Sequence, residues 1–178
     1  MKYVALVVIF THIGSFMFAG RSCSAEEKRQ LSNIEEHNKS IVLRYIQEVL
    51  DGKQFSLMPE LFTPDIQMHR PGGELNDLSY IQRAFSNALS QHTIQTTILD
   101  IFSSGNHVFV RLSHQMIYSS EHATLRSRIG NFDVAGKSIH WDAMAIFCFS
   151  NGKIAEEWVS RDELGMLMQI GKLELKVE

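Results

Sequence analysis

The hydrophobic pattern changes its period near Thr93, and this change limits the folds open to the chain. Before Thr93, apolar residues recur at helical spacing. After it, apolar and polar residues alternate over several long segments. Turn-forming residues at 103–106 and at Asn151-Gly152 separate alternating segments, and such short turns join antiparallel strands. Because the helices and the strands are segregated along the chain, the sequence predicts an α+β fold. We expect a curved antiparallel sheet packed with N-terminal helices, which can leave a pocket at its open end.

Three helices are expected before the sheet and one after it. The first begins with a capping box between Ser32 and Glu35 and ends at Asp51-Gly52. The other expected helix boundaries are Ser56, Pro64, Asp77 and Asp162. The expected strands cover 65–69, 94–102, 107–118, 123–129, 138–149 and 153–160. The segments 70–77 and 131–137 are expected to be loops.

The N-terminus has the pattern of a signal peptide: a positive start, an apolar stretch and then small residues. Small residues at the last and third-last positions predict cleavage after Ala25; an uncleaved anchor is the alternative. The expected organisation is a signal peptide over 1–25, a flexible lead over 26–33, one domain over 34–171 and a tail over 172–178. The mature protein is therefore expected to be exported, to a periplasm or out of the cell, with no membrane attachment.

Charge and cysteine content exclude several function classes. Cleavage would remove Lys2 and Arg21 but no acid, which changes the formal net charge from −3 to −5. An acidic chain is a poor nucleic-acid binder, since such proteins present a basic face. Only Cys148 would remain, so no internal disulfide can form. No zinc-site spacing, glycine-rich phosphate loop or nucleophile elbow is present, and we expect neither a metal nor a cofactor.

Glu156 is the first candidate for chemistry. If the strand is regular, Glu156 and Trp158 share a face, and an inward tryptophan would take the carboxylate inward with it. A carboxyl group buried there would have a raised pKa and could act as a general acid or base. The alternative is a structural role, at the rim of the sheet or paired with Arg111.

Two histidines are further candidates for proton transfer. His114 interrupts an apolar strand face, where a catalytic role competes with that of a hydrogen-bonded core residue. His69 ends a short strand just before a glycine-rich loop, where the mouth of a pocket could lie. His140 and Asp142 share the expected outer face of 138–149, so they belong to the surface or to a subunit contact unless a bulge intervenes.

The inward positions of 138–149 include large and small side chains. Trp141 can flank a cavity together with Trp158, although core packing would also explain both, and two alanines, Ala143 and Ala145, leave space between bulky neighbours. The outer positions Met144, Ile146 and Cys148 are apolar, which predicts a homodimer through the outer sheet face.

The C-terminal pattern resembles that of a known family. "NGKIAEEW", followed by Asp162 and "MLMQIG", is similar to the ending of SnoaL-like polyketide cyclases, which belong to the nuclear transport factor two-like superfamily. The segments "DIQMH", "NHVFVRL" and "NFDVAGKSI" resemble other parts of that family in the same order, so the resemblance spans 38–171.

This resemblance implies a cone-shaped α+β fold, with the curved sheet and the N-terminal helices around a pocket for a small, largely apolar molecule, and chemistry without a cofactor. In the cyclases an aspartate on the strand before the final hairpin acts as the acid and base, and Ala145 stands at that position here. Asp142 lies three residues away with the opposite parity. His69 and Glu156 match family positions and would supply proton transfer instead. The expected catalytic residues are Glu156, His69 and His114, and the expected ligand contacts are Trp141, Trp158, Ala145, Arg111 and Asp142.

Two hypotheses follow from these residues. The first is an exported enzyme that cyclises, isomerises or hydrates a small apolar carbonyl compound. The second is a non-catalytic protein of the same fold that binds a small ligand or a protein partner.

Overall fold

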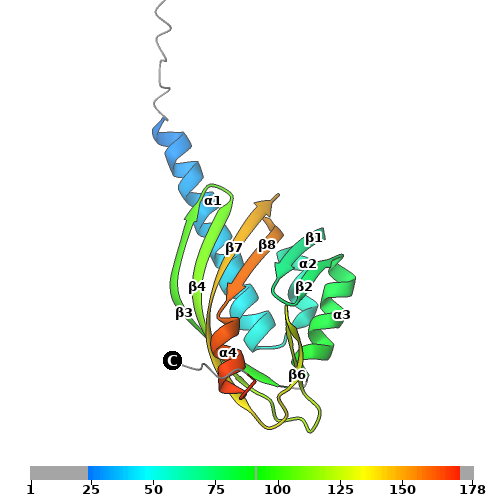
Figure 1. Cartoon of the computed structure of the whole chain (residues 1–178). Helices are drawn as coiled ribbons and strands as arrows, with labels where there is room; N and C mark the ends of the chain where they lie inside the picture. The colour runs from blue at the N-terminus through cyan, green and yellow to red at the C-terminus, as the bar shows by residue number, and fades with distance from the viewer. Residues whose placement is uncertain (1–23, 91, 173–178) are drawn as a thin grey trace, which may run out of the picture.

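A six-stranded curved sheet forms the body of the protein in a computed structural model that describes residues 24–90 and 92–172 (Figure 1). The strand order is β2-β1-β8-β7-β4-β3. Every neighbouring pair is antiparallel except β1 and β8, which run parallel. The strands are β1 Phe62–Arg70, β2 Gly73–Asn76, β3 Thr93–Ser104, β4 His107–Ile117, β7 Ser138–Ser150 and β8 Lys153–Arg161. A separate hairpin is formed by β5 Thr124–Ser127 and β6 Gly130–Asp133.

The helices pack mainly against one face of this sheet. α1 runs directly into a π-helical segment, η1, which contacts β3, and α3 contacts β1 and β2 (Figure 1). The core lies between these helices and the sheet, where Val42, Val49, Phe62, Val108 and Ile154 have no exposed surface. The helical segments are α1 Ala25–Arg44, η1 Tyr45–Asp51, η2 Phe55–Leu57, α2 Met58–Leu61, α3 Leu78–Leu89 and α4 Glu163–Gln169. The predicted α+β architecture is confirmed.

α1 begins earlier than the sequence predicted. Ser24 is its N-cap and forms a capping box with Glu27, so the expected box at Ser32 is wrong. Glu35 instead accepts a hydrogen bond from the backbone N–H of Gly105, at 2.8 Å. Residues 26–33, expected to be a flexible lead, are part of this helix. Residues 1–23 of the expected signal peptide lie outside the described residues.

Several strands also begin or end away from their predicted bounds. Pro64 was expected to end a helix but lies within β1, where the pairing with β8 is irregular between Phe62 and Gln67. A proline is tolerated there because it removes an N–H that an interrupted ladder does not need. β2 lies within the segment 70–77, which was expected to be a loop. β6 covers the first part of the other expected loop, 131–137. Asp77 and Asp162 cap α3 and α4 as predicted.

The inner faces of β4 and β7 agree with the predicted alternation. The even positions of β4 from Val108 to Met116 and the odd positions of β7 from Ile139 to Phe149 are buried. Beyond the end of β8, α4 lies beside β7, and the Gln169 amide bonds to both the N–H and the C=O of His140. This amide takes the place of a neighbouring strand at an otherwise open edge.

One extra residue in β8 reverses the predicted orientation of its two glutamates. Phe149 pairs with Ile154, but Cys148 pairs with Glu156, so Ala155 forms a β-bulge. As a result Glu157 faces inward with 2% of its surface exposed, whereas Trp158 is 38% exposed. The predicted inner position of Glu156 and Trp158 is therefore wrong, because it assumed an unbroken alternation through Ala155.

Within the described part of the chain, none of the helices has both the length and the apolar character needed to cross a membrane.

Candidate functional site

A row of polar and aromatic side chains lies on the inner face of the sheet. Thr96 on β3 pairs with His114 on β4, which pairs in turn with Trp141 on β7. The imidazole and the indole lie with ring centroids 5.2 Å apart. Both side chains are buried but keep 7% and 6% of their surface exposed, whereas Val108 on the same face of β4 has none. The row is thus internal without being fully sealed.

Asp51 connects this row to the helical layer. It is the last residue of η1, and its carboxylate accepts hydrogen bonds from the Thr96 backbone N–H at 3.0 Å and from the Thr96 hydroxyl at 2.7 Å. The same hydroxyl oxygen lies 3.0 Å from Nδ1 of His114. A chain of hydrogen bonds therefore links a carboxylate on η1 to an imidazole on β4.

Burial and nearby charge keep His114 neutral. Burial, together with the positive charges of Arg70 and Arg161, lowers the pKa of His114 to about 4. At neutral pH the ring carries one proton and one free lone pair. Within the described residues Nε2 makes no hydrogen bond, so the imidazole has the state that a general base requires.

A second internal cluster is built around Glu157. Nε and Nη2 of Arg70 donate to its carboxylate at 2.7–2.9 Å, and Nη2 also donates to the Tyr45 hydroxyl at 2.6 Å. The Tyr45 hydroxyl donates to Glu157 Oε1 at 3.5 Å. Burial raises the pKa of Tyr45, which keeps that hydroxyl protonated. Arg70 packs over the ring of Phe85 at 4.8 Å, and its Nη1 has no hydrogen-bond partner among the described residues.

Small side chains lie between the two clusters. Ala143 on β7 pairs with Leu112 and Arg161, and Ala145 pairs with Val110 and Val159. The alanines are the shortest side chains of the inner face of β7. The part of the face that they occupy has His114 and Trp141 on one side and β8 on the other.

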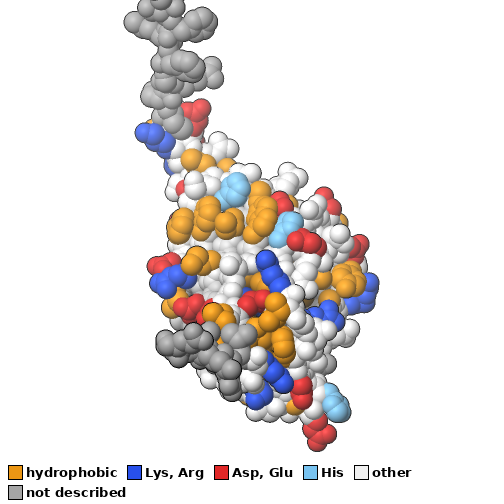
Figure 2. Space-filling model, in the orientation of Figure 1, with side chains coloured by type: hydrophobic (Ala, Val, Ile, Leu, Met, Phe, Trp, Pro, Cys, Tyr) orange, Lys and Arg blue, Asp and Glu red, His pale blue; other side chains and the backbone are white. Residues whose placement is uncertain are grey.

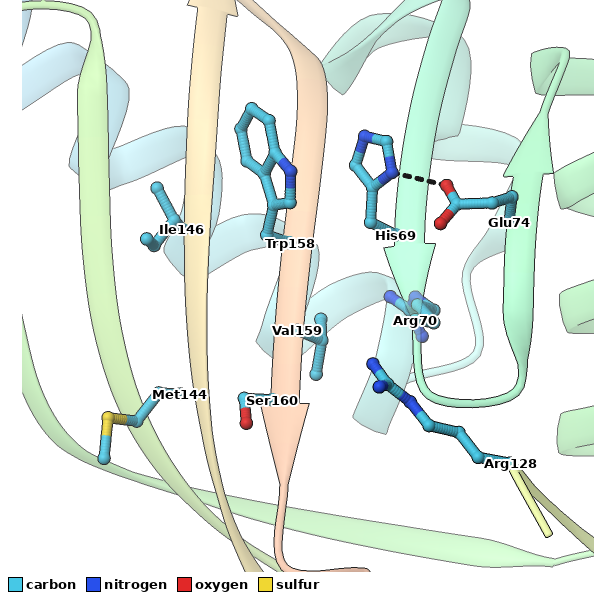
Figure 3. Close-up of a pocket in the computed structure, with 9 residues that line it drawn as sticks. All are labelled: His69, Arg70, Glu74, Arg128, Met144, Ile146, Trp158, Val159 and Ser160. Atoms are coloured by element: carbon cyan, nitrogen blue, oxygen red, sulfur yellow. Dashed lines mark ion pairs between the residues drawn. The ribbon is translucent and has the colours of Figure 1, made fainter.

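A shallow groove of about 250 Å³ lies on the opposite, outer face of the sheet (Figure 3). Its lining includes His69, Arg128, Met144, Ile146, Trp158 and Ser160. Nε2 of His69 lies 2.8 Å from Glu156, and Nδ1 is paired with Glu74. The hydrogen bond to Glu156 and the charge of Glu74 raise the pKa of His69. With a carboxylate at each ring nitrogen, the imidazolium form is stabilised, and neither nitrogen is left free to take a proton from a ligand.

The groove continues into an apolar row that crosses the outer face. The paired positions Phe102, Phe109, Ile146, Trp158, His69 and Glu74 run in sequence across all six strands. The rings of Phe102 and Phe109 are stacked with centroids 5.0 Å apart. Figure 2 shows hydrophobic side chains in a band over this part of the sheet. Phe102 is 59% and Met144 65% exposed, which is unusual for large apolar side chains outside an interface.

Comparison with known proteins places this architecture. The SnoaL-like domain pattern matches residues 42–157, which is more than half of the chain. The chain belongs to the SnoaL-like family. No protein of the curated set matches it.

Solved structures agree with this SnoaL-like assignment and with the nuclear transport factor two-like fold. An LEH-like epoxide hydrolase from M. tuberculosis is 11% identical, with a TM-score of 0.63, over 78% of this chain and 92% of that one. A SnoaL-like polyketide cyclase from Agrobacterium tumefaciens strain C58 is 17% identical, with a TM-score of 0.60, over 75% of this chain and 98% of that one. At these identities the likeness shows the fold alone, since one fold serves many functions.

The predicted catalytic residues of this SnoaL-like chain do not meet in one cavity. Glu156 and His69 are hydrogen-bonded to each other on the outer face, whereas His114 lies on the inner face. The expectation that all three converge is wrong. The bulge at Ala155 sends Glu156 outward, and β1 places His69 beside Trp158 on the same outer face.

The predicted ligand contacts divide in the same way. Trp141 and Ala145 are on the inner face, whereas Trp158 lines the outer groove. Arg111 pairs with Asp100 at 2.8 Å, which removes the alternative pairing with Glu156. Asp142 is exposed on the outer face as the alternation predicted, and the His140 ring bonds to the Ser113 hydroxyl rather than to Asp142.

Five polar residues of the inner clusters were missed: Tyr45, Asp51, Arg70, Thr96 and Glu157. Asp51 was interpreted only as the end of a helix, and Thr96 only as part of an alternating strand. The signal that could have found Glu157 is its neighbour, since two adjacent glutamates on a strand place one on each face whatever the register. Within residues 24–90 and 92–172, no group of three His, Cys, Asp or Glu side chains is arranged to hold a metal ion.

Proposed function

We propose that this SnoaL-like protein is an enzyme that moves a proton on a small, largely apolar carbonyl compound without a cofactor. The substrate would lie on the inner face over Ala143 and Ala145, with Nε2 of His114 as the base. The single observation that carries the proposal is the state of His114: buried, neutral, and bonded only through Nδ1.

The surrounding charges suit the abstraction of a proton beside a carbonyl group. When a base removes such a proton, negative charge develops on the carbonyl oxygen. The positive charges of Arg70 and Arg161 disfavour a positive charge on His114, and the same charges would favour negative charge on that oxygen. His114 would then return the proton to another position of the product, which completes an isomerisation or follows a ring closure. Glu157 is committed to Arg70 and would hold that cation in place rather than act as the acid.

Hydrogen exchange of a simple ketone tests this proposal without knowledge of the natural substrate. The probe is 2-tetralone, a planar apolar ketone, incubated with the protein in heavy water and followed by NMR. His114→Asn should slow the enzymatic exchange on the order of 10²-fold, the contribution typical of a general base. The matched control His107→Asn changes an exposed histidine at the far end of the same strand and should leave the rate unchanged. Equal rates in all three proteins would overturn the assignment of His114.

A non-catalytic binding protein is the second candidate, and a specific observation favours it. Ala145 supplies no acid at the position where the resemblance places the cyclase aspartate. If this reading is correct, the purified protein carries a small apolar molecule that mass spectrometry identifies. His114→Asn would then bind that molecule as tightly as the wild type.

The outer face supports a second copy of this chain as a partner. The apolar row crosses the whole sheet, and its phenylalanine end and its imidazolium end would come together in a two-fold arrangement. A cation over an aromatic face is favourable, so the row is complementary to itself. We therefore propose a homodimer through Phe109, Ile146 and Trp158.

Export is proposed from the sequence alone. Cleavage after Ala25 would remove Ser24 and with it the N-cap of α1. The mass of the mature protein, purified from the organism that makes it, tests the cleavage site. The compartment in which the protein is found tests the destination.

A further inference from the structure

The hydroxyl of Thr96 has only one hydrogen, and the structure shows where that hydrogen goes. The carboxylate of Asp51 accepts it at 2.7 Å and also accepts the Thr96 backbone N–H at 3.0 Å. Toward His114, 3.0 Å away, the hydroxyl oxygen can therefore only accept. The hydrogen of that second bond must be on Nδ1 of the imidazole.

We propose that Asp51 and Thr96 are positioning residues that hold His114 as its Nδ1–H tautomer, which leaves Nε2 as the unprotonated atom. This inference rests on the proposed function for its catalytic meaning, but not for its structural content. Asp51 acts through Thr96, and neither side chain needs to touch the substrate.

The local backbone explains why this chain of bonds exists. η1 is a π-helix, a form that occurs mostly in short pieces and often at functional sites. It ends at Asp51, whose carboxylate thereby reaches across to β3. Thr96 and His114 are a directly paired position of β3 and β4, so their side chains stand together on one face. The order carboxylate, hydroxyl, imidazole is set by these two elements.

Charged groups on three other strands of the sheet act on the same imidazole. Arg70 on β1 and Arg161 on β8 disfavour the imidazolium, as does His140 on β7, whereas Asp142 on β7 favours it. These long-range charges change how many protons the ring carries. They do not choose between its two nitrogens, and that choice depends on the hydrogen bond at Nδ1.

A proton–nitrogen correlation spectrum of the protein labelled with isotopic histidine measures the tautomer directly, with no substrate. In the wild type His114 should show a protonated Nδ1 and a bare Nε2 at neutral pH. Asp51→Asn puts an amide donor beside the Thr96 oxygen, which frees the hydroxyl hydrogen for Nδ1. The proton of His114 should then move to Nε2. Thr96→Val removes the acceptor and should also lose the Nδ1–H signal, whereas Thr96→Ser keeps the hydroxyl and should retain it.

His92 is the internal control for these spectra. It is also buried with its pKa lowered to about 4, but its Nε2 has no partner and it takes no part in this chain of bonds. Its signals should be the same in all four proteins, which also shows that each variant is folded.

The results separate this inference from the proposed function. A wild-type His114 with its proton on Nε2 overturns the inference, even if the protein is an enzyme. If one variant fails to fold, the wild-type spectrum still decides. If His114 shows the Nδ1–H tautomer but 2-tetralone does not exchange, the inference is supported and only the proposed enzymatic function is contradicted. If exchange is found, Thr96→Val should slow it on the order of 10²-fold and Thr96→Ser should restore it.

Discussion

The imidazole of His69 lies nearly parallel to the indole of Trp158, with ring centroids 5.2 Å apart and planes 14° apart. A carboxylate stands at each nitrogen of the same imidazole. The outer face therefore carries a ring whose protonated form is stabilised, stacked on an exposed aromatic ring at the end of an apolar row. This pair and the internal His114 are opposite cases: the neighbours of His69 raise its pKa, whereas burial lowers the pKa of His114.

Removal of the carboxylate of Glu156 should lower the pKa of His69. The hydrogen bond that His69 donates to Glu156 is the largest cause of its raised pKa, so Glu156→Gln should move its NMR titration midpoint to lower pH. Because the pKa of His69 is raised in the folded protein, its protonation stabilises the fold. This contribution is complete below the pKa of the unfolded chain, about 6.5, and it is lost as pH rises through the folded pKa. Because the pair is partly exposed, the loss of stability at low pH should be only about 0.5–1 kcal/mol. An unchanged midpoint in Glu156→Gln would contradict this account.

Acidification should destabilise the protein through its two buried histidines. The pKa values of His114 and His92 are lowered to about 4, so the unfolded chain binds protons that the folded chain does not. Their contribution is complete above the unfolded pKa of about 6.5 and is lost as pH falls through the folded pKa. Each histidine accounts for about 3 kcal/mol over this range.

Urea unfolding across that pH range measures the effect. His114→Gln should remove roughly half of the pH dependence, because glutamine does not titrate there. His107→Gln changes an exposed histidine that does not act on either buried ring, and it should leave the dependence as in the wild type. If the free energy of unfolding does not change between the folded pKa of about 4 and the unfolded pKa of about 6.5, the lowered pKa values of the two histidines are contradicted.

Loss of Arg70 should cost more than loss of the whole ion pair. Arg70→Met leaves the buried charge of Glu157 without its partner, which typically costs about 3–5 kcal/mol. The double variant Arg70→Met with Glu157→Gln removes that charge, and it should recover part of the loss. Urea unfolding of the two single variants and the double variant gives the coupling. Strictly additive losses would show that the two side chains stabilise the fold independently.

A charge in the middle of the outer row should prevent the proposed dimer. Ile146→Lys places an ammonium group between Phe109 and Trp158, where burial by a second copy would be unfavourable. Gln115→Lys adds the same charge to an exposed outer position of β4 away from the row. Sedimentation should show the wild type and Gln115→Lys as dimers and Ile146→Lys as a monomer. A monomeric wild type, or a dimeric Ile146→Lys, would contradict the interface.

The alternation of apolar residues predicted most of this fold. The inner faces of β4 and β7, the hairpin at Asn151-Gly152 and the caps at Asp77 and Asp162 follow from local chemistry, and they are confirmed. These features depend on residues that are close in sequence. The parallel pairing of β1 with β8 depends on how the two ends of the sheet meet, which no local pattern contains.

The candidate site was harder to predict, and Ala155 shows why. A bulge adds one residue without a distinctive sequence, yet it sends Glu157 inward and Glu156 outward. Parity arguments hold only as far as the next irregularity in the ladder. The bonds from Asp51 to Thr96 join residues that are far apart in the sequence, so neither residue alone suggested the other.

The π-helical segment has a consequence for how this protein can change. Tyr45 at its start contacts the Arg70–Glu157 pair, and Asp51 at its end contacts Thr96. If this segment had a different number of residues, at most one of these two side chains would keep its present direction. An insertion or deletion between them would therefore break one cluster while it spares the other. In evolution or engineering, the length of this short segment is less tolerant of change than its composition.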